Sequence, residues 1–495
     1  MHRSSNRPQS PFELAERGLF ADASKAIDAL PSPSISLQVL RAELDAHTAS
    51  PAAAQQRAEL LLAKTLPSSE SAACWAVVGH AAFKAGRLHH GLRGMDRALE
   101  SAMASGNAKL EYRIRDRLAF SLLNCVGAET ARAGMARLRQ SALRAGDIAS
   151  IVSFHIFAGA VDARQGRLPS SLSNLAIGRD LLQKFDNEWL RGRLEITSGV
   201  ACMLLSDYAA ATKHLEQARQ AALRSGSKEL SIAATGNLAT LMLAGRDFDH
   251  TRALLAELSA EIQRTGSVSS KLSVSDTALQ LALAEGDLPG AISIDDDSAE
   301  VVSEAEPGSL HRLWYLVDKV RLSYAKGEAQ AGLKVALDAL PYVQRSSDID
   351  LWRRLKLLVA EGLGRIGTPL EGAKSLREAV SGLPSCSVEI TAEKFRVAGH
   401  LSAREDADAA VSYFNQAQQI LQDVRNLNAS EEVRRSIKET IGGRPPAVCV
   451  HEFEAEQVVT LLQTSSYTPL LARGLMSWAA SRESFDWAAI EEIDA

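Results

Sequence analysis

Two interleaved series of turn residues, each repeating about every 40 positions, constrain the fold of this 495-residue chain most strongly. The first series opens short turns such as AGRL, at Gly18, Gly86, Gly127, Gly166, Gly245, Gly286, Gly327 and Gly367, with LSDYAAA (205–211) at the intermediate step. The second series falls between them, at Gly106, Gly146, Asp186, Gly226, Gly266, Gly308 and Ser347. Because helices commonly end in a residue with positive φ, glycine suits these positions. The spacing predicts a repeating unit of helix, turn, helix and turn.

The segments between the turns have the apolar periodicity of helices. In residues 172–185, Leu172, Leu175, Leu182 and Phe185 recur at roughly 3.6-residue spacing. Aromatic residues make up only 5% of the chain, while the helix formers Ala, Leu and Arg abound. A compact bundle would not need two phased turn series over some 300 residues. We therefore predict an all-α fold of stacked helical hairpins.

One copy of the unit is especially clear, at residues 75–98 (WAVVGHAAFKAGRLHHGLRGMDRA). It alternates large and small residues at Trp75, Gly79, Ala82, Gly91, Met95 and Ala98. This pattern resembles the tetratricopeptide repeat, although the period here is near 40 residues rather than about 34. The resemblance implies a right-handed superhelical α-solenoid of antiparallel hairpins. The spacing and turn style also resemble the arrays of large bacterial transcriptional and signalling regulators.

The sequence also suggests where the array begins and ends. Residues 1–10 are polar and predicted to be flexible, and the array is predicted to cover residues 11–425. Residues 426–446 read as a final helix followed by a Gly/Pro linker, because IGGRPP cannot continue a helix. Residues 447–495 contain further helical segments. They are either a cap over the last hairpin or the start of a following domain.

No motif for catalysis or cofactor binding is found. The patterns GxxxxGK[ST], HExxH and GxSxG are absent, and the adjacent His89 and His90 would point about 100° apart on a helix. The five cysteines lie far apart without a CxxC pair, at Cys74, Cys125, Cys202, Cys386 and Cys449. We interpret them as reduced, mostly buried helix residues. The chain is therefore expected to be non-enzymatic, with no cofactor or metal.

Two segments have strongly biased charge. Residues 84–144 carry twelve Lys and Arg against five acidic residues, which suggests an acidic partner or, as the alternative, a nucleic acid. Aromatic residues for base stacking are not interleaved there, so the acidic partner ranks first. Residues 285–308 carry eight acidic residues and no basic one. They read as an acidic loop and helix N-terminus or as a docking surface for a basic partner. Val301 stands where a Ca²⁺-binding loop would need glycine.

The resemblance to tetratricopeptide arrays also implies a binding groove lined by the first helix of each hairpin. Its predicted partner-binding residues are His80, Lys84, Arg117, Ser121, Ala160 and Arg164. The implied function is a non-enzymatic scaffold that binds a protein or peptide in this groove. Its implied setting is the sensory or regulatory module of a bacterial signalling or transcription-regulation system.

Charge and hydropathy bear on the compartment. The net charge of −5 gives no global excess of basic residues to attract nucleic acid. The N-terminal segment MHRSSNRPQSP has no apolar core of the kind found in secretory signals. No stretch approaches 18 uninterrupted apolar residues. These observations predict a cytoplasmic protein with no membrane association.

Overall fold

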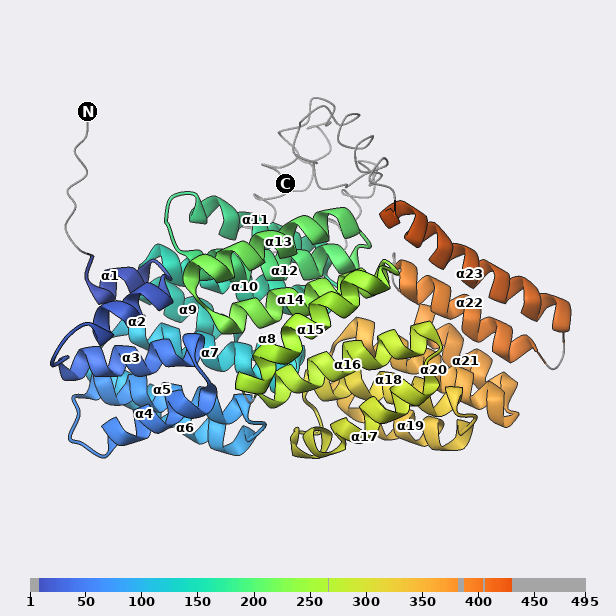
Figure 1. Cartoon of the computed structure of the whole chain (residues 1–495), viewed down its shortest axis with the longest axis horizontal. Coiled ribbons are helices and arrows are strands. Elements are labelled where there is room, and N and C mark those ends of the chain that lie inside the picture. Colours follow the sequence, from blue (N-terminus) through green and yellow to red (C-terminus); the bar gives the residue numbers. More distant parts are fainter. Residues whose placement is uncertain (1–8, 266, 382–386, 404–405, 430–495) are drawn as a thin grey trace, which may run out of the picture. The chain divides into compact units, whose positions relative to one another are not determined.

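A computed structural model describes residues 9–265, 267–381, 387–403 and 406–429 of the chain (Figure 1). Contacts divide the chain into Met1–Arg425 and Asn426–Ala495. The helices described here belong to the first unit, apart from the last residues of α23. The predictions made for residues 1–8 and for residues 430–495, including the linker and the cap or following domain, lie outside the described residues.

Every regular element in the described ranges is an α-helix, and from α3 onward the helices form ten consecutive hairpins (Figure 1). The first helices are α3 (Ile35–Thr48), α5 (Ser68–Lys84), α7 (Ala108–Cys125), α10 (Ile148–Arg164), α12 (Glu188–Leu204), α14 (Lys228–Ala244), α16 (Val268–Glu285), α18 (Leu310–Ala325), α20 (Ile349–Ile366) and α22 (Val388–Ser402). The second helices are α4 (Pro51–Leu62), α6 (Leu88–Ser105), α8 (Ala128–Ala133) with α9 (Met135–Ala145), α11 (Leu168–Leu182), α13 (Tyr208–Ser225), α15 (Phe248–Thr265), α17 (Leu288–Glu304), α19 (Ala329–Ser346), α21 (Pro369–Val380) and α23 (Ala407–Ala429). Two short helices, α1 (Pro11–Glu16) and α2 (Phe20–Asp28), precede them. The predicted all-α, tetratricopeptide-like fold is confirmed.

The turn residues picked out by the period mark the helix ends. Positive φ angles occur in both series, at Gly18, Gly86, Gly106, Gly127, Gly146, Gly166, Gly226, Gly286, Gly327, Gly367 and Ser347. One member is displaced by a residue: Gly245 has a φ of −74°, and Arg246 takes the left-handed conformation instead. Ser206 fills the same role in the intermediate turn. The period thus specifies where each helix stops.

A third periodic series, in polar capping residues, specifies where the first helices begin. The side chain of each accepts a hydrogen bond from the backbone N–H three residues later, which satisfies a donor that the helix leaves free. The members are Asn107, Asp147, Asn187, Ser227, Ser267, Asp348 and Ser387. Helix start and helix stop signals therefore repeat in phase along the array.

Within the hairpin of α5 and α6, two glycines let the helices touch through their backbones. A Cβ atom added at Gly79 would lie 3.0 Å from both the Gly91 carbonyl oxygen and the Met95 nitrogen. One added at Gly94 would lie 2.7 Å from the Gly79 Cα. Met95 and Ala98 are fully buried beside this crossing. The small residues of the repeat pattern are packing residues, as the sequence suggested.

We expect the substitution Gly79→Leu to destabilise the array by about 1–3 kcal/mol, because the larger side chain must force α5 and α6 apart. Urea denaturation followed by far-UV circular dichroism measures the change. Gly134→Ala is the matched control, since a Cβ there would meet only the Ala131 carbonyl oxygen at 3.6 Å. The control should be neutral or slightly stabilising. Equal stability of Gly79→Leu and the wild type would contradict the close crossing.

The array coils so that hairpins five steps apart touch one another. Helix α3 packs against α14, α7 against α18, and α8 against α19. The Val388 N–H at the start of α22 donates a hydrogen bond of 2.9 Å to Ser206 Oγ at the end of α12. This closure was not predicted from the sequence. It places the inward faces of the first helices around a common interior, which the next section describes.

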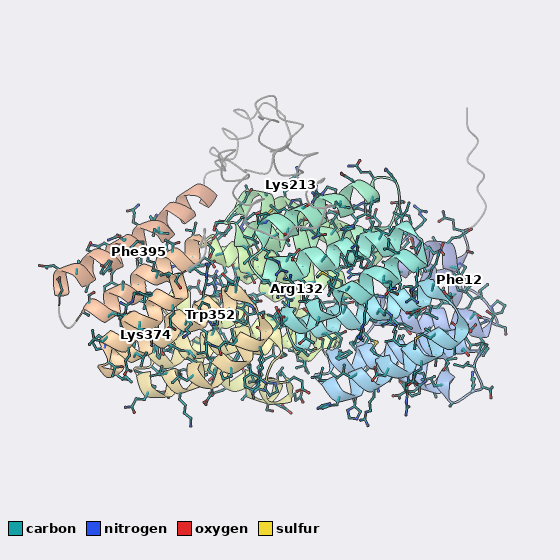
Figure 2. The ribbon with its side chains drawn as sticks, turned by 180° about the vertical axis from the view of Figure 1, so that it is seen from behind. Phe12, Arg132, Lys213, Trp352, Lys374 and Phe395 are labelled. Atoms are coloured by element: carbon teal, nitrogen blue, oxygen red, sulfur yellow. The ribbon has the colours of Figure 1, made fainter. Side chains whose placement is uncertain are left out.

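Second helices present much of their polar surface to solvent. Arg132, Lys213 and Lys374 are exposed side chains of α8, α13 and α21 (Figure 2). The inward faces of the second helices contribute fully buried residues to the hairpin cores, such as Met95 of α6 and Leu215 of α13. Each first helix packs one face against its second helix. The face that points away from the second helix lines the interior of the array.

Candidate functional site

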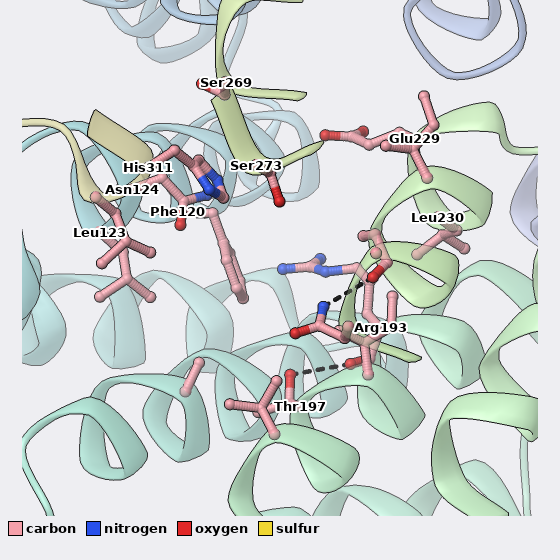
Figure 3. Close-up of a pocket in the computed structure, with 18 of the residues that line it drawn as sticks. Phe120, Leu123, Asn124, Arg193, Thr197, Glu229, Leu230, Ser269, Ser273 and His311 are labelled. Atoms are coloured by element: carbon pink, nitrogen blue, oxygen red, sulfur yellow. Dashed lines mark hydrogen bonds between the residues drawn. The ribbon is translucent and has the colours of Figure 1, made fainter. Parts of the chain in front are cut away.

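The first helices enclose a cavity of about 1370 Å³ (Figure 3). Its walls come mainly from α5, α7, α10, α12, α14, α16 and α18, with further residues from α3 and from the later helices. Lining side chains recur about one repeat apart, as in Ser153, Arg193, Ala233 and Ser273. The cavity is therefore a product of the period and of the coiling together.

All six predicted groove residues line this cavity. His80 and Lys84 come from α5, Arg117 and Ser121 from α7, and Ala160 and Arg164 from α10. The structure thus brings these residues to one surface. Their role in binding a partner stays a prediction.

Lys84 belongs to an ion cluster that joins the early helices α3 and α5 to the later helix α14. Its Nζ lies 2.6 Å from Glu229 Oε1, and the Glu229 carboxylate also lies 3.5 Å from His47 Nδ1 and 3.9 Å from His80 Nε2. Burial alone would raise the pKa of Glu229, but the Lys84 charge and the His47 hydrogen bond outweigh it and hold that pKa well below its usual range. Glu229 therefore ties α14 to α3 and α5.

The two histidines of this cluster are neutral at pH 7. Burial lowers the pKa of both His47 and His80 below the ordinary value. Neither ring nitrogen of His80 has a hydrogen-bond partner among the described residues. His47 Nε2 lies 3.4 Å from Arg117 Nη2. This end of the cavity thus has the cations Lys84 and Arg117 beside the carboxylates of Glu229 and Glu43.

Arg164, one of the predicted groove residues, lines the cavity and is also hydrogen-bonded within the array. Its guanidinium donates hydrogen bonds to the Leu123 carbonyl oxygen at 2.6 Å and to Asn124 Oδ1 at 2.7 Å. The prediction placed Lys84 and Arg164 on an open groove. Because both side chains hold neighbouring helices together, reversing either charge would disturb the fold as well as any ligand.

Arg193 of α12 is a cavity residue that the sequence interpretation missed. Its Nη1 lies 3.0 Å from both Asp116 Oδ2 and Ser153 Oγ, and its guanidinium stacks over the Phe120 and Trp189 rings at 4.0 and 4.5 Å. Figure 3 shows it projecting toward Phe120. Its position in the repeat could have indicated that Arg193 faces the cavity, because it lies 40 positions after Ser153, which also lines the cavity.

The wall formed by the later hairpins is a network of acidic and arginine side chains. Arg321 donates to Asp318 Oδ1 at 2.7 Å and to Glu393 Oε2 at 2.9 Å. Further pairs join Arg354 to Asp350 and Glu389, and Arg396 to Glu361 and Glu393. This wall differs in character from the basic end around Lys84 and Arg117.

The biased segment 84–144 does not act as one surface. Lys84, Arg113 and Arg117 line the cavity, and Arg113 also pairs with Glu43, whereas Arg115 and Arg144 both pair with Glu111. Its predicted docking of an acidic partner or a nucleic acid stays a prediction.

The acidic segment 285–308 differs from the predicted loop and helix N-terminus. Asp295, Asp296 and Asp297 lie in the middle of α17, so the dipole of the helix start does not explain them. Asp295 instead accepts hydrogen bonds from the Tyr315 hydroxyl at 2.7 Å and from Lys319 Nζ at 2.9 Å. Asp296 and Asp297 are exposed, and the proposed basic partner for this segment stays a prediction.

Metal and thiol chemistry find little support in the described part of the chain. No group of three His, Cys, Asp or Glu side chains there could hold a metal ion, and His89 and His90 are exposed. Burial raises the pKa of the Cys74 thiol to about 12 and that of Cys125 to about 11, so neither is a ready thiolate. Among the described helices, none has the length and apolar character needed to span a membrane.

The described residues form an all-α array of stacked, tetratricopeptide-like hairpins around an internal cavity. No model of a known protein family and no curated protein matches the chain. Among solved structures, the chain is similar to the crystal structure of yeast Tom70, with 12% sequence identity and a TM-score of 0.36. The alignment covers 87% of this chain and 92% of that chain. At this level the likeness says nothing about function.

Proposed function

We propose that this protein is a non-catalytic scaffold that binds an extended segment of a partner protein inside the cavity. The observation that carries the proposal is the cavity lined by successive first helices. Its volume of about 1370 Å³ exceeds the roughly 300–1,000 Å³ typical of small-molecule sites. Contacts between hairpins five steps apart limit the width of the cavity. An extended chain therefore suits this space better than a folded domain does.

The lining has the composition that peptide recognition needs. The aromatic rings of Phe120, Trp189 and Trp314 offer apolar anchors, and Asn237 and Ser273 offer polar groups suited to a peptide backbone. Lys84 and Arg117 lie on α5 and α7, whereas the mixed network of acidic and arginine side chains lies on the later helices, and this asymmetry would favour one direction of a bound segment. The array thus supplies apolar anchors, polar groups for a peptide backbone and charge asymmetry from several of its first helices.

The wider setting that we propose is a sensory or regulatory one in a bacterial signalling or transcription system, within the cytoplasm. It rests only on the likeness of the 40-residue repeats to those of bacterial regulators. Identifying what is captured in cells by photo-crosslinking from Thr197, followed by mass spectrometry, tests this setting. Crosslinks to metabolic enzymes alone would contradict it.

Direct nucleic-acid binding through residues 84–144 is the alternative that the sequence left open. It predicts an affinity for DNA or RNA that falls steeply as salt rises. The ion pairs of Arg113, Arg115 and Arg144 do not favour it. Retention on a nucleic-acid column at moderate salt would revive it.

Blocking the cavity tests the proposed function. Thr197 faces the cavity (Figure 3), so we expect Thr197→Trp to abolish binding of fluorescent randomised peptide pools in an anisotropy assay. Leu223→Trp is the control, because Leu223 is 72% exposed on α13 and does not line the cavity. Matched circular dichroism of the two variants shows that both fold. Peptide binding that survives Thr197→Trp, or wild-type protein that binds no pool, would overturn the proposal.

A further inference from the structure

One pair of acidic side chains in the cavity wall lacks the partner that its neighbours have. Asp276 of α16 and Asp318 of α18 both line the cavity, and their carboxyl groups lie close enough for one to hydrogen-bond the other. Asp318 is fully buried. The pair joins the first helices of two successive hairpins, so it is held by the packing of α16 against α18.

Each carboxyl group of this pair has one oxygen atom that accepts a hydrogen bond and one that does not. Asp318 Oδ1 accepts from Arg321, and Asp276 Oδ2 accepts from Gln280 Nε2 at 3.3 Å. Asp318 Oδ2 and Asp276 Oδ1 are buried and have no hydrogen-bond partner among the described residues. Buried carboxylate oxygens without partners are costly, so something must occupy the space between the charges.

A shared proton fills that role in the free protein. Burial, and then the charge of Asp318, raise the pKa of Asp276 well above its usual range, while Gln280 and Arg321 oppose the rise. The charge of a neighbouring carboxylate opposes ionisation of Asp276, so the protonated form of Asp276 is favoured in the free protein. The other titratable group near Asp276 is Tyr315, whose hydroxyl is engaged by Asp295.

The arginines of the surrounding network are engaged by carboxylates other than Asp276. Its carboxylates are Asp276, Asp318, Asp350, Glu361, Glu389 and Glu393, and its guanidinium groups are Arg321, Arg354, Arg365 and Arg396. Each of these arginines already contacts at least one carboxylate of the network, and Asp276 contacts none of them within ion-pair distance. The Asp276–Asp318 pair therefore has one guanidinium group, that of Arg321, for two carboxyl groups.

We propose that the Asp276–Asp318 pair binds a guanidinium or ammonium group of the segment held in the cavity, and that the shared proton leaves to solvent as this cation arrives. The inference rests on the proposed function, because the cation belongs to the bound segment. A lysine or arginine side chain supplies the several N–H donors that two carboxylates can accept. A bare divalent ion would want more oxygen ligands than this pair presents.

The exchange has a defined pH dependence. Binding removes one proton from the pair and places one positive charge beside two carboxylates, so protons are released on association. Affinity for a cationic segment therefore rises with pH until the pair loses its proton without a ligand. A segment without a cation leaves the proton in place and shows no such dependence from these groups.

The test compares two fluorescent nonapeptide pools, one with arginine fixed at a central position and one with its uncharged isostere citrulline. Wild-type full-length protein should bind the arginine pool at least about tenfold more tightly. Asp276→Asn should remove that preference, because asparagine mimics the protonated acid but cannot ionise. Asp296→Asn, the same change at an exposed position of α17, should preserve it. Calorimetry in buffers of different ionisation enthalpy should show release of about one proton for the arginine pool alone.

The outcomes separate this inference from the proposed function. Equal binding of both pools by wild type, or an arginine preference that survives Asp276→Asn, overturns the inference and leaves the scaffold proposal standing. Failure of wild type to bind any pool overturns both. Tight binding of free spermidine that matches the arginine pool would show a polyamine site, and it would equally overturn the claim that the cation belongs to a peptide.

Discussion

The substitution Gly127→Ala is expected to destabilise the protein by roughly 3 kcal/mol or more. Gly127 has φ 129° and ψ 176°, a conformation that is open essentially to glycine alone. A Cβ there would also lie 2.7 Å from the Ser346 carbonyl oxygen, and closer still to the Ser346 Cα. Because these are backbone atoms, α8 and α19 must separate to make room.

Gly106→Ala separates the two causes. Gly106 also has a positive φ of 67°, but a Cβ at this position would meet nothing within 4 Å. We expect it to cost about 1–2 kcal/mol, from the backbone conformation alone. Hydrogen exchange should accelerate in α19 for Gly127→Ala and stay unchanged there for Gly106→Ala. Equal losses of stability and equal exchange in the two variants would mean that the contact between coils contributes nothing.

The hairpins could be predicted from the sequence because their signals are local. Glycine at a helix end and a polar capping residue at the next helix start act within a few residues of the chain. The same holds for the small residues at the crossing of α5 and α6, since a hairpin packs against itself. These local signals recur in every repeat. Predicting the left-handed residue at Gly245 when it is Arg246 therefore does not shift the other helix boundaries.

The coiling could not be predicted in this way. It depends on small rotations between hairpins, which add up over five steps until Gly127 meets Ser346. No single residue of the 40-residue unit indicates the rotation angle between successive hairpins. The sequence therefore indicated which faces look inward, as for His80 and Lys84, but not that Glu229 would close on Lys84 from another coil. Contacts between residues far apart along the chain decided which groove residues are paired.

The acidic end of the cavity was missed for the same reason. Asp276 and Asp318 are single acids in separate helices, and neither stands out in the sequence. Their significance comes from burial and from each other's charge, which only the packing of α16 against α18 creates. By contrast, the conspicuous run Asp295–Asp297 lies in the middle of α17, where its residues are exposed or paired locally.

The substitution Glu361→Gln should cost about 3 kcal/mol at pH 7, the lower part of the range for breaking a buried ion network. The Glu361 side chain is only 1% exposed, and its carboxylate lies 2.7 Å from Arg365, 2.6 Å from Arg396 and 3.5 Å from His400. Removing its charge leaves cations facing one another. The cost stays near the lower limit because Arg365 and Arg396 keep about a third of their surface in solvent.

The pH dependence of that difference identifies its electrostatic origin. Burial would raise the pKa of Glu361, but the charge and hydrogen bond of Arg396 outweigh it and hold the pKa below the ordinary 4.5. A depressed pKa gives stability that is fully present above 4.5 and is lost as pH falls through the folded-state value. The gap between wild type and Glu361→Gln should therefore shrink below pH 4.5, as measured by urea denaturation. Burial lowers the pKa of His400 to about 4 against the opposing charge of Glu361, so His400 is neutral in both folded proteins above that pH and its contribution differs between them only below it. Glu378→Gln, which removes an exposed carboxylate beside Lys356, should change stability little at any pH. A gap for Glu361→Gln that persists undiminished in acid would assign the loss to packing rather than to charge.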